Sequence, residues 1–173
     1  MLTRSALVLG GAASGKSAWA EEVLKNVGQP MVYVATGRIF DDEVAQKVAV
    51  HKKRRDARWR TIEAPLDVGP ALESVAADDS VLIDCATMWL TNHMMDGNDL
   101  TAAQDALLAA LRACPARWII VSNEVGQGIV PNNALSRRFR EAQGRLNIVL
   151  AREAETVVQV TAGLPLALKG QLP

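Results

Sequence analysis

A short segment near the N-terminus has the residue types and spacing needed to bind the phosphates of a nucleotide. Residues 10–17 read GGAASGKS and fit the pattern G-x-x-x-x-G-K-[ST]. Glycines allow the backbone to wrap round a polyphosphate with several N–H groups directed inward, and a helix that begins at the end of the pattern adds positive charge. The pattern predicts a phosphate-binding loop (P-loop) formed by Gly10, Gly11, Ala12, Ala13, Ser14, Gly15, Lys16 and Ser17. The alternative is an ordinary glycine-rich turn between a strand and a helix.

Two side chains of this loop and one distant carboxylate suggest phosphate transfer with Mg²⁺. In a P-loop the lysine reaches the β- and γ-phosphates and the hydroxyl binds Mg²⁺, which assigns these roles to Lys16 and Ser17. Residues 81–84, VLID, predict a buried strand that ends in a carboxylate. An acid at such a strand end helps to hold Mg²⁺ in P-loop proteins, so Asp84 is the second predicted metal ligand. Because the VLID pattern is short, a chance match is the alternative.

Other polar residues lie where the chain leaves predicted elements. Thr36 and Gly37 follow the apolar run 31–35, and loops at the carboxyl ends of parallel strands bind ligands; a plain turn is the alternative. His51 falls on the apolar stripe of a helix predicted for residues 41–54, so the pattern alone favours a histidine at the edge of the core. The basic run after it is typical of a solvated helix end. His93 has no partner pattern, which favours a structural or surface role.

The elements that would position these residues alternate between strands and helices. Apolar, β-branched runs predict strands, and patterns of period 3.6 predict helices. We expect strands at residues 6–9, 31–35, 59–63, 81–84, 118–122 and 156–161, an edge strand within 163–168, and helices at 17–24, 41–54, 66–76, 87–95, 101–113 and 135–153. Fully apolar strands between helices predict an α/β fold: three layers, with a mostly parallel sheet flanked by helices, as in P-loop NTPases of the RecA-like kind.

Composition narrows the class of protein further. The chain has 173 residues, 49% hydrophobic and 22% charged, with a formal net charge of zero. These values predict a single globular domain over residues 1–173 and give no sign of a nucleic-acid or membrane partner. No apolar run reaches the roughly 18–20 residues that span a bilayer. Cys85 and Cys114 lack metal or redox spacing, and with a nucleotide site this predicts a cytoplasmic protein without a signal peptide.

Several segments together resemble one enzyme family. They are the P-loop, Thr36 followed by residues 41–43 and His51, the W-x-T-x-E segment at residues 59–63, and residues 123–131, NEVGQGIVP, with Arg137, Phe139, Arg140, Gly144 and Asn147 after them. This set is similar to the bifunctional adenosylcobinamide kinase / adenosylcobinamide-phosphate guanylyltransferase of cobalamin biosynthesis. Ile148, where the family usually has Gln, and His93, where an apolar residue is common, depart from its pattern.

The resemblance implies two reactions and a set of site residues. ATP or GTP would phosphorylate the aminopropanol hydroxyl of adenosylcobinamide. GMP from GTP would then pass through a guanylylated histidine, at the position of His51, to give adenosylcobinamide-GDP. The resemblance also implies that Thr36, Gly37, Lys52, Lys53, Arg54, Arg55, Glu63 and Asp84 line the nucleotide site, with Asp84 serving either Mg²⁺ or the guanine edge. It further implies a homotrimer. The alternatives are a P-loop small-molecule kinase without a covalent intermediate and a nucleotide-dependent regulatory switch.

Overall fold

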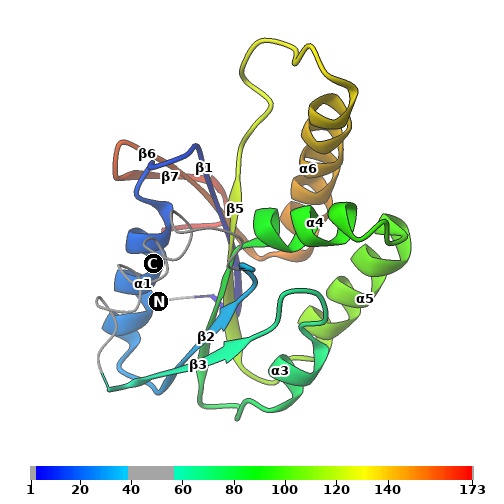
Figure 1. Cartoon of the computed structure of the whole chain (residues 1–173). Coiled ribbons are helices and arrows are strands. Elements are labelled where there is room, and N and C mark those ends of the chain that lie inside the picture. Colours follow the sequence, from blue (N-terminus) through cyan, green and yellow to red (C-terminus); the bar gives the residue numbers. More distant parts are fainter. Residues whose placement is uncertain (1–2, 39–56, 173) are drawn as a thin grey trace.

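A computed structural model describes residues 3–38 and 57–172. Its strands form one seven-stranded sheet in the order β3-β2-β4-β5-β1-β6-β7 (Figure 1). All neighbouring strands are parallel except β6 and β7, which are antiparallel. The elements are β1 (Ser5–Gly10), α1 (Lys16–Val27), β2 (Met31–Ala35), β3 (Trp59–Glu63), α3 (Gly69–Glu73), β4 (Ser80–Asp84), α4 (Ala86–Met95), α5 (Leu100–Ala113), β5 (Arg117–Asn123), α6 (Ala134–Glu153), β6 (Thr156–Thr161) and β7 (Leu164–Lys169).

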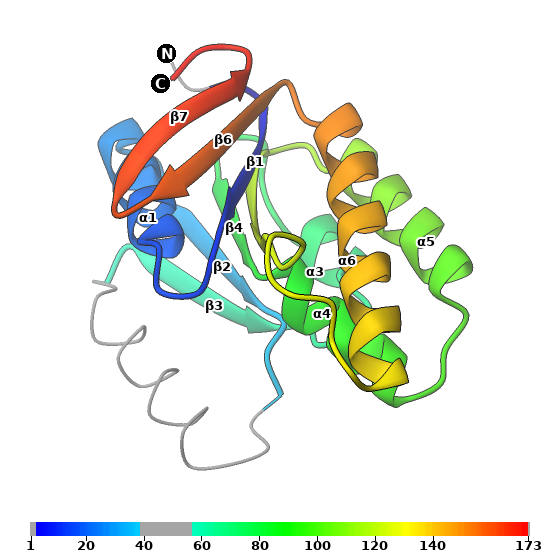
Figure 2. The ribbon, with the colours of Figure 1, turned by 90° about the horizontal axis from the view of Figure 1, so that it is seen from above.

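Helices cover both faces of this sheet. Side chains alternate along each central strand, so Leu7 joins the core under α3, α4, α5 and α6, while Val8 joins the core under α1. Figures 1 and 2 show α1 on one side of the sheet and the other described helices on the opposite side. The central strands β1, β2, β4 and β5 are buried on both faces, which explains their mostly apolar sequences. The predicted three-layer α/β fold with a mostly parallel sheet is confirmed.

The order of the strands determines which loops meet. β1 lies between β5 and β6, and the parallel direction of these strands brings their carboxyl ends to one edge of the sheet. β4 is separated from β1 by β5, but α1 packs across β1, β5 and β4. The carboxyl ends of β2 and β4 lie at the same edge. The P-loop, Thr36, Glu63 and Asp84, which are the predicted site residues that follow or end described strands, therefore lie at one edge, as expected for an open parallel sheet.

One helix is much shorter than predicted. Residues 66–76 were expected to be helical, but α3 covers only Gly69–Glu73. Asp67 accepts a hydrogen bond from the Gly69 N–H at 2.9 Å, which holds the preceding residues in a turn. At the other end, the Ser74 hydroxyl donates to the Ala71 carbonyl at 2.8 Å. These local side-chain bonds compete with the helix at both ends, and the apolar periodicity does not reveal them.

The last predicted strand is confirmed as an edge strand. β7 pairs only with β6 in the described sheet, and Pro165, which has no N–H to donate, is tolerated there. In residues 3–38 and 57–172, no helix combines the length and the apolar character needed to cross a membrane.

Candidate active site

The P-loop connects the carboxyl end of β1 to the start of α1. Gly15 has φ 92°, a conformation that side chains other than glycine rarely adopt, and α1 begins at the next residue. No side chain of the described residues caps this end of α1. The backbone N–H groups of the first turn are therefore available to an anion, and the helix dipole favours negative charge at that point.

The turn between β6 and β7 supports the P-loop from outside. The Gly163 N–H donates to the Ser14 carbonyl at 2.8 Å. A Cβ at Gly15 would lie 3.1 Å from the Gly163 Cα, and a Cβ at Gly10 would lie 2.7 Å from the Val160 carbonyl oxygen. Glycine at positions 10 and 15 is thus needed for this close approach as well as for the shape of the loop. This support comes from residues that sequence analysis did not connect with the nucleotide site.

Lys16 lies at the centre of the predicted chemistry. Its side chain is buried, with 9% exposed, and its ammonium donates to the Gly11 carbonyl at 3.0 Å. The charge of Lys16 also acts on Cys85, next to Asp84, which brings the loop lysine and the end of β4 together. Burial, reinforced by the Asp84 carboxylate, raises the pKa of Cys85 to about 12. Cys85 is therefore a protonated thiol at neutral pH and is unsuited to act as a nucleophile.

Asp84 has the chemistry of a magnesium ligand. It is the last residue of β4 and is half-buried. Its Oδ2 accepts a hydrogen bond from the Tyr33 hydroxyl at 3.1 Å. Ser17 is half-buried in the first turn of α1, a helix that packs against β4. Mg²⁺ prefers oxygen ligands and in nucleotide sites is held largely by phosphates and water. One carboxylate and one hydroxyl fit that requirement, and the described residues contain no cluster of three or more His, Cys, Asp or Glu side chains.

Glu63, Asp84 and the end of β2 lie side by side at the sheet edge. In the strand register, Ala35 pairs with Glu63 on one side and with Asp84 on the other. Thr36 follows Ala35 and is completely buried, and its hydroxyl both donates to the Cys85 carbonyl and accepts from the Cys85 N–H, each at 2.7 Å. Thr36 therefore ties the end of β2 to the residue after Asp84. Gly37 is half-buried and Glu63 is exposed.

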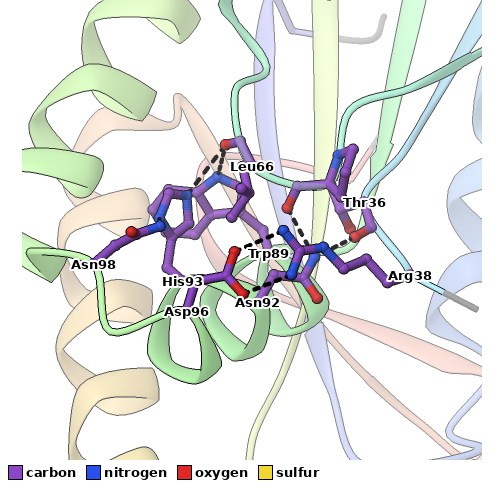
Figure 3. A network of polar contacts seen from close by, with 9 residues as sticks. Thr36, Arg38, Leu66, Trp89, Asn92, His93, Asp96 and Asn98 are labelled. Atoms are coloured by element: carbon purple, nitrogen blue, oxygen red, sulfur yellow. Dashed lines mark hydrogen bonds and ion pairs between the residues drawn. The ribbon is translucent and has the colours of Figure 1, made fainter. Parts of the chain in front are cut away.

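A polar network from α4 holds these loops in place (Figure 3). Asn92 is completely buried, and its amide nitrogen donates at 2.8 Å to the Thr36 carbonyl and at 2.8 Å to the Pro65 carbonyl. Arg38 makes a two-pronged ion pair with Asp96, at 2.8 and 2.7 Å. The hydrogen bond from Arg38 lowers the pKa of Asp96, so the pair survives to lower pH than an isolated aspartate would allow.

His93 has the structural role that its isolated position in the sequence favoured. It is buried, its ring lies 4.5 Å from the ring of Trp89, and Nε2 lies 3.2 Å from the Leu66 carbonyl oxygen. The Asn98 amide nitrogen lies 3.0 Å from Nδ1. The Leu66 carbonyl can only accept, so Nε2 donates its N–H to it, and the Asn98 amide lies at the other ring nitrogen. Both ring nitrogens are occupied, which leaves neither for catalysis.

We expect Asn92→Ala to destabilise the protein by roughly 2–4 kcal/mol, because the Thr36 and Pro65 carbonyls would each lose a buried hydrogen bond. Urea unfolding of the variant and of the wild type measures this difference. Asn132→Ala, which changes an exposed asparagine in the β5–α6 loop, is the matched control and should shift stability by less than about 0.5 kcal/mol. A loss no larger than that of the control would contradict the role assigned to Asn92.

The P-loop forms one wall of a pocket of about 470 Å³. Its lining consists of Gly11, Ala12, Ala13, Ser14, Glu124, Gln127, Gln159, Val160, Thr161 and Ala162. The residues from 159 onward were not predicted as part of the site. The signal that could have found them is the parallel pairing of β6 with β1, which brings the end of β6 to the same edge. The predicted residues His51, Lys52, Lys53, Arg54 and Arg55 lie outside the described residues.

Comparisons with solved structures show where this fold occurs. The crystal structure of the flagellar accessory protein FlaH from Methanocaldococcus jannaschii is similar over 95% of this chain and 77% of that chain, with a TM-score of 0.56 and 14% identity. A structure from Pyrococcus horikoshii OT3 is similar over 97% of this chain and 87% of that chain, with a TM-score of 0.58 and 9% identity. At this identity the likeness is one of fold, and it agrees with the predicted P-loop NTPase architecture.

Comparisons of sequence identify the family. The bifunctional adenosylcobalamin biosynthesis protein CobP of Pseudomonas aeruginosa is 44% identical over 95% of this chain and 97% of its own length. The bifunctional adenosylcobalamin biosynthesis protein CobU of Salmonella typhimurium is 39% identical, and that of Escherichia coli 36%, each over 94% of this chain and 98% of the relative. The model of the family described as cobinamide kinase / cobinamide phosphate guanyltransferase matches residues 6–168. The chain therefore belongs to the cobinamide kinase / cobinamide phosphate guanyltransferase family.

Proposed function

We propose that this protein phosphorylates adenosylcobinamide with ATP or GTP and then transfers GMP from GTP to the product, giving adenosylcobinamide-GDP and pyrophosphate. The observation that carries the proposal is the P-loop at the carboxyl end of β1, with Lys16 buried in it and acting, like Asp84, on the Cys85 thiol at the end of β4, in a chain of this family. A lysine, helix N–H groups and a carboxylate for Mg²⁺ are the groups that phosphoryl transfer needs, because catalysis of this reaction is mostly positioning and charge stabilisation.

His51 is our proposed nucleophile of the second reaction. A neutral imidazole nitrogen attacks the α-phosphorus of GTP, a bond from nitrogen to phosphorus forms, and pyrophosphate leaves. The phosphate of the acceptor then displaces the histidine and takes the GMP. Lys52, Lys53, Arg54 and Arg55 follow His51 in the sequence and supply positive charge for these phosphates. Thr36, Gly37, Glu63 and Asp84 complete the proposed nucleotide site, with Mg²⁺ on Ser17 and Asp84.

One experiment tests this function directly. The protein is incubated with GTP and Mg²⁺ for intact-mass measurement, and separately with adenosylcobinamide and ATP labelled in the γ-phosphate. We expect an acid-labile mass increase of one GMP in the first reaction and a labelled corrinoid in the second. A labelled corrinoid without a covalent nucleotide would support the simple kinase instead. Neither product, with slow hydrolysis and a conformational response to nucleotide, would support the regulatory switch.

Two further features belong to the proposal. The family resemblance supports a homotrimer, which sedimentation of the purified protein would measure. A nucleotide-dependent enzyme of corrinoid synthesis is also suited to the cytoplasm, where nucleoside triphosphates are made.

A further inference from the structure

One carboxylate of the P-loop pocket has no part in the function proposed so far. Glu124 directly follows β5, the neighbour of β1, and its N–H donates to the carbonyl of Gly10, the first P-loop glycine, at 3.0 Å. Its side chain lines the pocket together with Gly11, Ala12, Ala13 and Ser14. Figure 2 shows the loop after β5 between the P-loop and α6. Glu124 is half-buried, so its carboxylate is within reach of a ligand in this pocket.

The Glu124 side chain is held in one orientation by its own loop. The Gly126 N–H donates to Oε1, and a Cβ at Gly126 would lie only 2.7 Å from that oxygen, so a larger residue there would displace the carboxylate. Arg140 on α6 donates in turn to the Gly126 carbonyl. The bond from Gly126 uses Oε1 and leaves Oε2 as an acceptor. A carboxylate held in this way is suited to catalysis, because a catalytic side chain must keep a defined orientation toward the reacting group.

The base of the same loop is fixed by a buried polar cluster. Ser122 and Gln143 are completely buried, and Asn147 accepts hydrogen bonds from both, at 2.6 Å from the serine hydroxyl and 3.0 Å from the glutamine amide. The Asn147 amide nitrogen donates to the Asn123 carbonyl at 3.0 Å, one residue before Glu124. Because buried, hydrogen-bonded side chains rigidify what they contact, α6 determines where Glu124 stands relative to the P-loop.

Asp84 and Glu124, two carboxylates at the edge of the sheet that carries the P-loop, lie in different surroundings. Asp84, at the end of β4, accepts from Tyr33, and Asp84 and Lys16 both act on the neighbouring Cys85 thiol. Glu124 is the acidic residue among those that line the P-loop pocket in the described part of the chain. A kinase that transfers phosphate to an alcohol needs a group that accepts the proton of the hydroxyl, and carboxylates perform this task in other kinases.

We propose that Glu124 is the catalytic base of the phosphorylation step, with Oε2 as the proton acceptor. The hydroxyl oxygen of the acceptor forms a bond to the γ-phosphorus while the bond from that phosphorus to the nucleoside diphosphate breaks, and the hydroxyl proton passes to Glu124. This inference rests on the proposed kinase function. It assigns Glu124 no role in guanylyl transfer, where the nucleophile is a histidine and the acceptor is already a phosphate.

The test is Glu124→Gln, which keeps the size of the side chain and an oxygen to accept from Gly126. We expect kcat for phosphorylation of adenosylcobinamide to fall by about 10²–10⁴-fold, with the KM for ATP unchanged and covalent labelling by GTP retained. Glu124→Asp keeps the carboxylate and should restore part of the rate. Glu73→Gln, an exposed glutamate on α3, is the control and should behave like the wild type.

Two results would overturn the inference. One is a kcat of Glu124→Gln within a few-fold of the wild type. The other is a parallel loss of phosphorylation and of GTP labelling, which would mean that Glu124 only shapes the P-loop. Failure of the proposed function itself is distinguishable, because the wild type would then neither phosphorylate adenosylcobinamide nor acquire GMP.

Discussion

Lys16→Ala is expected to lower the rates of both adenosylcobinamide phosphorylation and protein guanylylation, each by about 10²–10³-fold. Phosphorylation builds negative charge on the β-phosphate of the leaving nucleoside diphosphate and on the transferred γ-phosphoryl group. Guanylylation builds it on the β- and γ-phosphates that leave as pyrophosphate, and Lys16 is the cation predicted to face these phosphates in both reactions. The side chain is 9% exposed, and the hydrogen bond it makes goes to the Gly11 carbonyl of the same loop. Its removal therefore takes a charge from the site with little effect on the core.

Measurement of the two reactions in parallel makes this prediction specific. Transfer of γ-phosphate to adenosylcobinamide reports the first, and the rate of covalent labelling by GTP reports the second. Lys25→Ala, which removes a lysine from the other end of α1, is the matched control and should leave both rates close to those of the wild type. Far-ultraviolet circular dichroism and the unfolding midpoint establish that the Lys16 variant is folded. GTP labelling of Lys16→Ala at the wild-type rate would contradict a single P-loop that serves both reactions.

His51→Ala is expected to abolish the covalent adduct and guanylyl transfer while phosphorylation continues. The chain has two histidines, and the structure removes the other from consideration, because both ring nitrogens of His93 are engaged with Leu66 and Asn98. Cys85, the other nucleophilic type of side chain beside the P-loop lysine, is kept as a thiol by a pKa of about 12. A GMP linked to a histidine nitrogen therefore has one candidate position in the sequence, His51.

Intact mass after incubation with GTP, followed by localisation of the adduct, measures this effect. His93→Ala is the control: it should lose stability, because it breaks the contacts with Trp89 and Leu66, yet it should still acquire GMP. An adduct that persists in His51→Ala would show that another residue is the nucleophile. Equal loss of both activities in folded His51→Ala would mean that His51 also shapes the kinase site.

The P-loop, the sheet and the position of Asp84 could be predicted because each depends on a contiguous stretch of sequence. Residues 10–17 carry their chemistry in their own spacing, and a short apolar run such as 81–84, which follows the turn residues 78–80, is typical of a strand buried on both faces. Once strands and helices alternate, the parallel order brings Gly10, Thr36 and Asp84 to one edge. These inferences need only the spacing of apolar and polar residues along the sequence. They do not require knowing which strands are neighbours in the sheet.

The parts that could not be predicted depend on contacts between distant residues. Asn92 looks like any polar residue of a helix, and its importance comes from the carbonyls of Thr36 and Pro65, which reach it from two other loops. The same holds for Gly163, which contacts Ser14 across nearly the whole chain. Thr36 was predicted from its place after a strand, but the use of its hydroxyl to hold Cys85 follows only from the neighbouring strand β4.

The position of β1 between β5 and β6 also has a consequence for how the protein is made. Ribosomes release the N-terminus first, so residues 10–17 emerge early, but both neighbours of β1 and the Gly163 N–H that supports the loop come from the last third of the chain. A nascent chain that ends before β6 has the phosphate-binding sequence, but it lacks the β6 strand beside β1 and the Gly163 N–H that supports the loop. Nucleotide can therefore stabilise the shaped loop only after β6 and the turn that follows it have been made.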